Sequence, residues 1–133
     1  MILFIDNEEA RIRSWVDELN EEGFQVEVLS SADAARHALD AADPPQCVVL
    51  DLMIPADGEV PDRETAYGTR TGLWLLQRFR KIHGQVPVVV LTNVDDPGVE
   101  EAVISLAAVY RRKRDCGPAR LVELIRLLTS GTG

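Results

Sequence analysis

Four polar residues, far apart in the chain, each fall where a short apolar run ends. They are Asp6, Asp51, Thr92 and Lys113. If these side chains met, two carboxylates could attract a divalent cation, and an ammonium group and a hydroxyl could bind phosphoryl oxygens. The residue types therefore suit a site for a divalent cation and a phosphoryl group, provided that the fold brings them together.

Short apolar runs alternate with segments of helical periodicity along the whole chain. The apolar runs are residues 2–5, 24–29, 47–50, 86–91 and 107–110. The helical patterns cover residues 12–19, a weak Ala-rich stretch that follows a cap at Ser30 or Ser31 and ends at residue 39, and residues 75–82, 99–106 and 121–128. Strands joined by helices pair in parallel, so the pattern predicts an α/β domain with a doubly wound, five-stranded parallel sheet and helices on both faces. Ligands of such sheets lie beyond the carboxyl ends of the strands, where the four polar residues fall.

Composition limits the class of protein. The chain has 133 residues, 46% of them hydrophobic, which fits one domain with one core. A formal net charge of −8 disfavours direct binding of nucleic acid, because the phosphates would be repelled. No run approaches the roughly 20 apolar residues of a membrane span, and the N-terminus has no basic leader. We therefore expect a cytoplasmic protein without a membrane partner, in which Cys47 and Cys116 are free thiols.

Four motifs at the strand ends together resemble the receiver domain of response regulators in bacterial two-component systems, of the chemotaxis-receiver type. Residues 4–8 (FIDNE) resemble its acidic first-strand motif, and residues 48–55 (VVLDLMIP) its phosphoacceptor motif. Residues 88–92 (VVVLT) resemble its hydroxyl motif, and residues 110–113 (YRRK) its aromatic-x-x-Lys. Each motif alone is weak, but all four in register are specific, and together they cover nearly the whole chain.

The resemblance implies a fold and domain limits. The fold is a single doubly wound sheet with the flavodoxin-like strand order 2-1-3-4-5. The receiver domain would span residues 1–129, and residues 130–133 would form a flexible tail.

The resemblance also implies a chemical role for each residue of the site. Asp51 would be phosphorylated by a sensor histidine kinase or a histidine phosphotransfer protein. Mg2+ would be the cofactor, and its ligands would be Asp6, Asn7, Asp51 and the backbone carbonyl of Met53. Lys113 would pair with the phosphoryl oxygens.

A two-residue switch is implied as well. Thr92 would complete the catalytic set with Asp51 and Lys113 by donating a hydrogen bond to the phosphoryl group. Tyr110 would turn inward behind it and change the surface of the last two helices and strand. That surface would bind a downstream protein target, and a homodimer through it is compatible with the pattern.

Three features depart from the family pattern. Asn7 stands where a second acid is usual, which predicts weaker Mg2+ binding than in typical receivers. Arg114 follows Lys113 where proline is usual, so we expect a trans peptide bond there. The stretch of about residues 56–70 is an insertion, roughly a dozen residues longer than the family needs. A solvated loop and a lid or docking element both fit it.

Two other functions remain open. The three departures favour a degenerate receiver that acts as a phosphorylation-independent interaction module, and the intact acceptor, hydroxyl and lysine disfavour it. An enzyme or cofactor binder, such as a flavin carrier or a phosphatase, is disfavoured because the acidic residues 6–9 would repel a bound phosphate, and residues 51–53 offer no second carboxylate. We expect a signalling switch that catalyses only its own phosphorylation and dephosphorylation.

Overall fold

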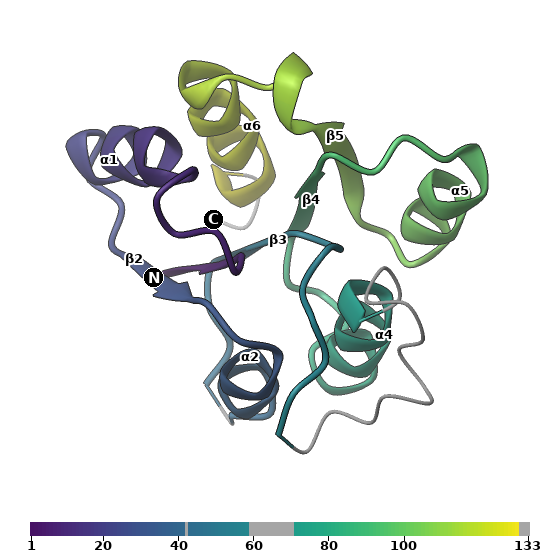
Figure 1. The fold of residues 1–133 in the computed structure, drawn as a ribbon. Helices are drawn as coiled ribbons and strands as arrows, with labels where there is room; N and C mark the ends of the chain where they lie inside the picture. The colour runs from purple at the N-terminus through teal and green to yellow at the C-terminus, as the bar shows by residue number, and fades with distance from the viewer. Residues whose placement is uncertain (42, 59–70, 131–133) are drawn as a thin grey trace.

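A five-stranded parallel sheet forms the centre of the computed structural model, which describes residues 1–41, 43–58 and 71–130 (Figure 1). The strands are β1 (Ile2–Ile5), β2 (Val26–Leu29), β3 (Cys47–Leu50), β4 (Val88–Thr92) and β5 (Val109–Arg112). Their order is β2-β1-β3-β4-β5, and every neighbouring pair is parallel. The predicted fold class and strand order are confirmed.

Helices cover both faces of this sheet (Figure 1). The helices of the described residues are α1 (Arg13–Glu21), α2 (Ala32–Leu39), α4 (Thr71–Ile82), α5 (Pro97–Ser105) and α6 (Pro118–Ser130), with a short 3-10 helix η1 (Lys113–Asp115) before α6. Core residues of α1 and α6 pack with Ile2 and Phe4 on one face. Core residues of α2, α4 and α5 pack with Leu3 and Ile5 on the other. Because both faces are covered, β1, β3 and β4 are apolar and buried along almost their whole length.

Three strands begin later than the sequence pattern predicts. β2 starts at Val26 rather than residue 24, and β4 starts at Val88 rather than residue 86. β5 spans Val109–Arg112 rather than residues 107–110, because Ala107 takes a left-handed conformation (φ 58°) in the turn after α5. The corrected limits place Thr92 inside the end of β4 and Lys113 directly after β5.

Both cysteines are free, as predicted, and both are buried. Burial raises the pKa of the Cys47 thiol to about 12. Among the described helices, none has the length and apolar character required to cross a membrane. Residues 59–70 of the expected insertion and residues 131–133 of the expected tail lie outside the described residues.

Candidate functional site

The order of the strands brings three polar residues to one edge of the sheet. β3 lies between β1 and β4, and the Asp51 amide donates to the Ile5 carbonyl at 2.9 Å, which places Asp6 and Asp51 beside each other at the carboxyl ends. Thr92 is the last residue of the neighbouring β4. Lys113 begins η1 after β5 and extends across this edge.

The four side chains form one hydrogen-bonded cluster. The Thr92 hydroxyl donates to Asp51 Oδ1 at 2.8 Å. Lys113 Nζ lies 2.7 Å from Asp6 Oδ2 and 3.2 Å from Asp51 Oδ2. Asp6 and Thr92 are fully buried, and Asp51 is 5% exposed. The structure therefore joins all four residues selected from the sequence, while their chemical roles stay predictions.

Backbone amides fix the orientation of the two carboxylates. The Glu8 amide donates to Asp6 Oδ1 at 2.8 Å, and the Met53 amide donates to Asp51 Oδ1 at 3.1 Å. Each donor lies two residues after its aspartate, which is the geometry of an Asx turn. The turns leave Asp6 Oδ2 and Asp51 Oδ2 directed toward the ammonium group of Lys113.

The cluster holds two carboxylates against one ammonium group, so it carries one negative charge in excess. Burial raises the pKa of Asp6 and the charge of Asp51 adds to this, whereas the hydrogen bond from Lys113 opposes it. Burial alone would lower the pKa of Lys113, but the two carboxylates outweigh it and the pKa of Lys113 is raised. Both shifts favour bound protons, as an excess of buried negative charge should.

The donor set fits Mg2+. Lys113 Nζ lies between the two carboxylates, so these oxygens already face a single positive charge. Oxygen ligands of this kind suit Mg2+, which binds through few carboxylates and keeps several waters. Asn7 is exposed, and Met53 is 47% exposed, so the structure does not bring either side chain into the buried cluster. Ligand roles for Asn7 and the Met53 carbonyl stay predictions.

Tyr110 and Thr92 are linked through one residue of the loop between β4 and α5. The Tyr110 hydroxyl donates to the Val94 carbonyl, and the Val94 amide donates to the Thr92 hydroxyl at 3.3 Å. Tyr110 is 9% exposed, and burial together with the charge of Asp95 raises the pKa of its phenol. Both residues of the expected switch thus point inward, Thr92 toward Asp51 and Tyr110 toward the loop.

The family model described as the response regulator receiver domain matches residues 2–126 of this chain. The chain belongs to this family. Solved structures show the same fold at low sequence identity. A receiver domain protein from Methanospirillum hungatei is 19% identical, with a TM-score of 0.79 over 98% of this chain and 93% of the other. The receiver domain of NtrX from Brucella abortus is 23% identical, with a TM-score of 0.77 over 98% of each chain. No curated protein matches the chain.

Sequence reasoning missed one group of contacts beside the receiver site. Arg112 Nη1 lies 2.8 Å and Arg114 Nη2 3.2 Å from Asp95 Oδ2, in the loop that contains Val94. The described residues include no cis peptide bond, so the bond between Lys113 and Arg114 is trans, as expected. The available signal was charge: basic residues around Lys113 match an acidic pair, Asp95 and Asp96, after Thr92.

The described start of the expected insertion, residues 56–58, contacts α2. Asp57 Oδ1 accepts from the Asp33 amide at 2.8 Å, in the first turn of α2, where Ser31 Oγ also caps the helix by accepting from the Ala34 amide at 3.1 Å. Carboxylates at this position stabilise a helix because they accept from its unpaired amides. Residues 59–70 of the expected insertion lie outside the described structure, and the solvated loop and the lid or docking element both stay predictions.

Proposed function

We propose that Asp51 accepts a phosphoryl group from a phosphohistidine of a sensor histidine kinase or histidine phosphotransfer protein in the cytoplasm. An Asp51 carboxylate oxygen would attack phosphorus and form an acyl phosphate. The phosphorus–nitrogen bond would break, and its electron pair would leave with the histidine ring nitrogen, which takes up a proton. The protein would be a signalling switch that catalyses only this transfer and the later hydrolysis.

One observation carries the proposal: Asp51 is contacted by a hydroxyl, an ammonium group and a backbone amide at the same time. Thr92 and the Met53 amide contact Oδ1, and Lys113 contacts Oδ2. After transfer, these donors would bind phosphoryl oxygens in place of the free carboxylate. Asp6 and Asp51 would hold Mg2+, which when bound supplies neutralising charge to the phosphoryl group.

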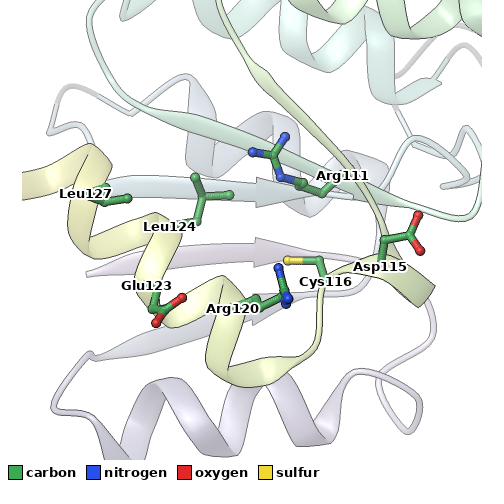
Figure 2. Close-up of a pocket in the computed structure, with 7 residues that line it drawn as sticks. All are labelled: Arg111, Asp115, Cys116, Arg120, Glu123, Leu124 and Leu127. Atoms are coloured by element: carbon green, nitrogen blue, oxygen red, sulfur yellow. The ribbon is translucent and has the colours of Figure 1, made fainter.

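The output surface would be α5, β5 and α6. Tyr110 lies on β5, and the Val94 carbonyl that it contacts lies three residues before α5. A hollow of about 170 Å³ opens on this surface between β5 and α6 (Figure 2), and its lining residues are Arg111, Asp115, Cys116, Arg120, Glu123, Leu124 and Leu127. Mixed charge and apolar area of this kind suit a protein partner. We propose a downstream protein target here, with a homodimer through the same surface as one form of it.

The deciding experiment uses acetyl phosphate with Mg2+ and measures the intact mass of the protein. We expect wild-type protein and Thr92→Ser to gain one phosphoryl group and Asp51→Asn to gain none. Beryllofluoride with Mg2+ should then shift the backbone NMR signals around Val94 in wild type and Thr92→Ser. It should shift them much less in Thr92→Ala, which lacks the hydroxyl. Wild-type protein that neither gains mass nor responds to beryllofluoride would refute the proposal and favour binding without phosphorylation.

A further inference from the structure

Asp95 ties the loop after Thr92 to the segment that carries Lys113. Its Oδ2 accepts hydrogen bonds from Arg112 at 2.8 Å and Arg114 at 3.2 Å. These arginines stand immediately before and after Lys113 in the chain. The two strand ends that supply the hydroxyl and the ammonium group are therefore connected outside the site as well as through Asp51.

The loop held by Asp95 also carries the contacts of the switch. Val94 directly precedes Asp95 and binds both Thr92, through its amide, and Tyr110, through its carbonyl. Asp96 follows and caps α5 by accepting from the Gly98 amide at 2.8 Å. Because Val94 lies between Thr92 and two anchored carboxylates, holding Asp95 restricts the positions that the Val94 backbone can take.

We propose that Asp95 is a positioning residue for the switch. Its ion pairs with Arg112 and Arg114 favour the arrangement in which Thr92 contacts Asp51 and Tyr110 points inward, even before a phosphoryl group is present. The biological meaning of this bias rests on the proposed function, while the bias itself is a property of the unphosphorylated protein. Arg114 stands where receivers usually have proline, so the second ion pair depends on a feature of this chain.

The exposure of the three side chains sets the strength of the bias. The exposed fraction is 61% for Asp95, 35% for Arg112 and 68% for Arg114. Exposed ion pairs are weak and are screened by salt, so this group shifts an equilibrium without locking it. A weak bias leaves Tyr110 free to respond further when Asp51 is phosphorylated.

The test compares Asp95→Asn with the matched control Asp115→Asn. Asp115 also pairs with Arg112, at 2.7 Å, but it lies in η1 and not in the loop after Thr92. The readout is the ratio of outward to inward Tyr110 in metal-free, unphosphorylated protein, from NMR signals of labelled tyrosine rings assigned with Tyr110→Phe. We expect Asp95→Asn to raise this ratio about two- to fivefold, as loss of exposed ion pairs allows. Asp115→Asn should leave it unchanged, and Asp95→Glu should restore most of the wild-type value.

Salt gives a second readout that a merely structural role would not move. Raising the salt from about 0.02 to 0.5 M should bring the wild-type ratio toward that of Asp95→Asn, because screening weakens the ion pairs. The ratio in Asp95→Asn should change little. Equal ratios in Asp95→Asn and Asp115→Asn, or equal salt dependence in wild type and Asp95→Asn, would overturn the proposal. Unfolding midpoints measured in the same buffers show whether each variant is fully folded at the temperature of the NMR experiment.

Adding beryllofluoride and Mg2+ last separates this proposal from the proposed function. If Asp95→Asn shifts Tyr110 but beryllofluoride has no effect on any form, the positioning role stands and the phosphoryl-acceptor role fails. If beryllofluoride moves Tyr110 inward but the two asparagine variants behave alike, only the positioning role fails.

Discussion

Excess negative charge is the main electrostatic property of the site at the scale of single residues. Asp6 and Asp51 share one ammonium group from Lys113, and the pKa of Asp6 is raised by burial and by the charge of Asp51. A divalent cation would remove this excess. Each further carboxylate at the rim should therefore strengthen cation binding.

Asn7→Asp tests this expectation directly. Asn7 is exposed next to Asp6, and an aspartate there would add one negative charge close to the cation. We expect Mg2+ affinity to rise about tenfold, on the order of a Coulomb attraction over a few ångströms at a wet surface. A titration followed by calorimetry measures it, with Asn7→Ala as the control that removes the amide without adding charge. Equal affinity of Asn7→Asp and wild type would contradict the expectation.

Residue type predicted the central site far better than its surroundings. Asp6, Asp51, Thr92 and Lys113 could be selected because each follows an apolar run, and parallel sheets gather such positions at one edge. The pairing of Asp95 with Arg114 is not marked by an apolar run, and only the charges of the two residues point to it. It joins the loop after β4 to η1, and this contact depends on local conformations that hydrophobic periodicity does not encode.

At the scale of elements, one bidentate ion pair joins α2 to α4 on the same face of the sheet. Arg78 donates from Nε and Nη2 to the two oxygens of Asp40, each at 2.8 Å. Asp40 is the C-cap residue of α2, and its side chain is 24% exposed. The hydrogen bonds from Arg78 hold the pKa of Asp40 below its usual value, although burial opposes them. The pair thus stabilises the packing of two helices and does so in a pH-dependent way.

Asp40→Asn should lower the free energy of unfolding by about 1 kcal/mol at pH 7, the scale of a partly exposed ion pair with good geometry. Since the pKa of Asp40 is lower in the folded state, its stabilisation is present above the unfolded value of 3.8 and disappears as pH falls through the folded value. Urea unfolding should therefore show the gap between wild type and variant closing below pH 3.8. Asp17→Asn, an exposed change on α1, is the control. A gap that stays constant with pH would argue against the ion pair as its cause.

Gly72 lets α4 approach the site closely. A Cβ atom on this residue would lie 2.4 Å from the Leu52 Cα and 3.0 Å from the Asp51 carbonyl oxygen. Alanine normally favours a helix by about 1 kcal/mol over glycine. Here the clash should prevail, and Gly72→Ala should destabilise the domain by about 1–3 kcal/mol, as overpacking does. Gly84→Ala, whose nearest contact would be 3.5 Å, is the matched control for the same unfolding measurement. Equal effects of the two substitutions would refute the close-approach argument.

Helix and strand types followed the sequence pattern closely, but some ends did not. Ser31 caps α2 by accepting from a backbone amide of its first turn. Asp96 caps α5, which begins at Pro97, two residues before the apolar pattern starts. The start of β5 was misplaced because Ala107 adopts a left-handed conformation that alanine rarely takes. The carbonyls of Leu106 and Ala107 in this turn accept from Arg80 on α4 at 2.7 and 3.0 Å, and hydrophobic periodicity does not show such a long-range contact.

At the scale of the molecule, helices on both faces of the sheet carry exposed apolar side chains. Leu127 on α6 is 75% exposed, beside the hollow between β5 and α6 (Figure 2). Ile82 on α4, which packs on the opposite face, is 44% exposed. If the proposed partner surface includes α6, only the first of these side chains should matter for association.

If the partner is a second copy of the chain, Leu127→Asp should abolish the self-association that beryllofluoride induces in wild type, while leaving phosphorylation of Asp51 intact. Burying a charge in place of an apolar contact disfavours the complex, whereas the site lies elsewhere in the fold. Sedimentation velocity with and without beryllofluoride measures the oligomeric state, and intact mass after acetyl phosphate measures phosphorylation. Ile82→Asp is the control and should associate like wild type. Loss of association in both variants, or in neither, would remove α6 from the partner surface.

Because both native thiols are buried, the domain is suited to labelling at a cysteine introduced elsewhere. Cys47 is fully buried, Cys116 is 2% exposed, and burial raises the pKa of both, that of Cys47 to about 12. Thiol reagents attack the thiolate, so neither native cysteine should react while the domain stays closed. A cysteine introduced on an exposed helix would then accept a dye without removal of the native pair. The slow rate at which Cys47, in the central strand β3, is modified would then report how often the entire domain unfolds.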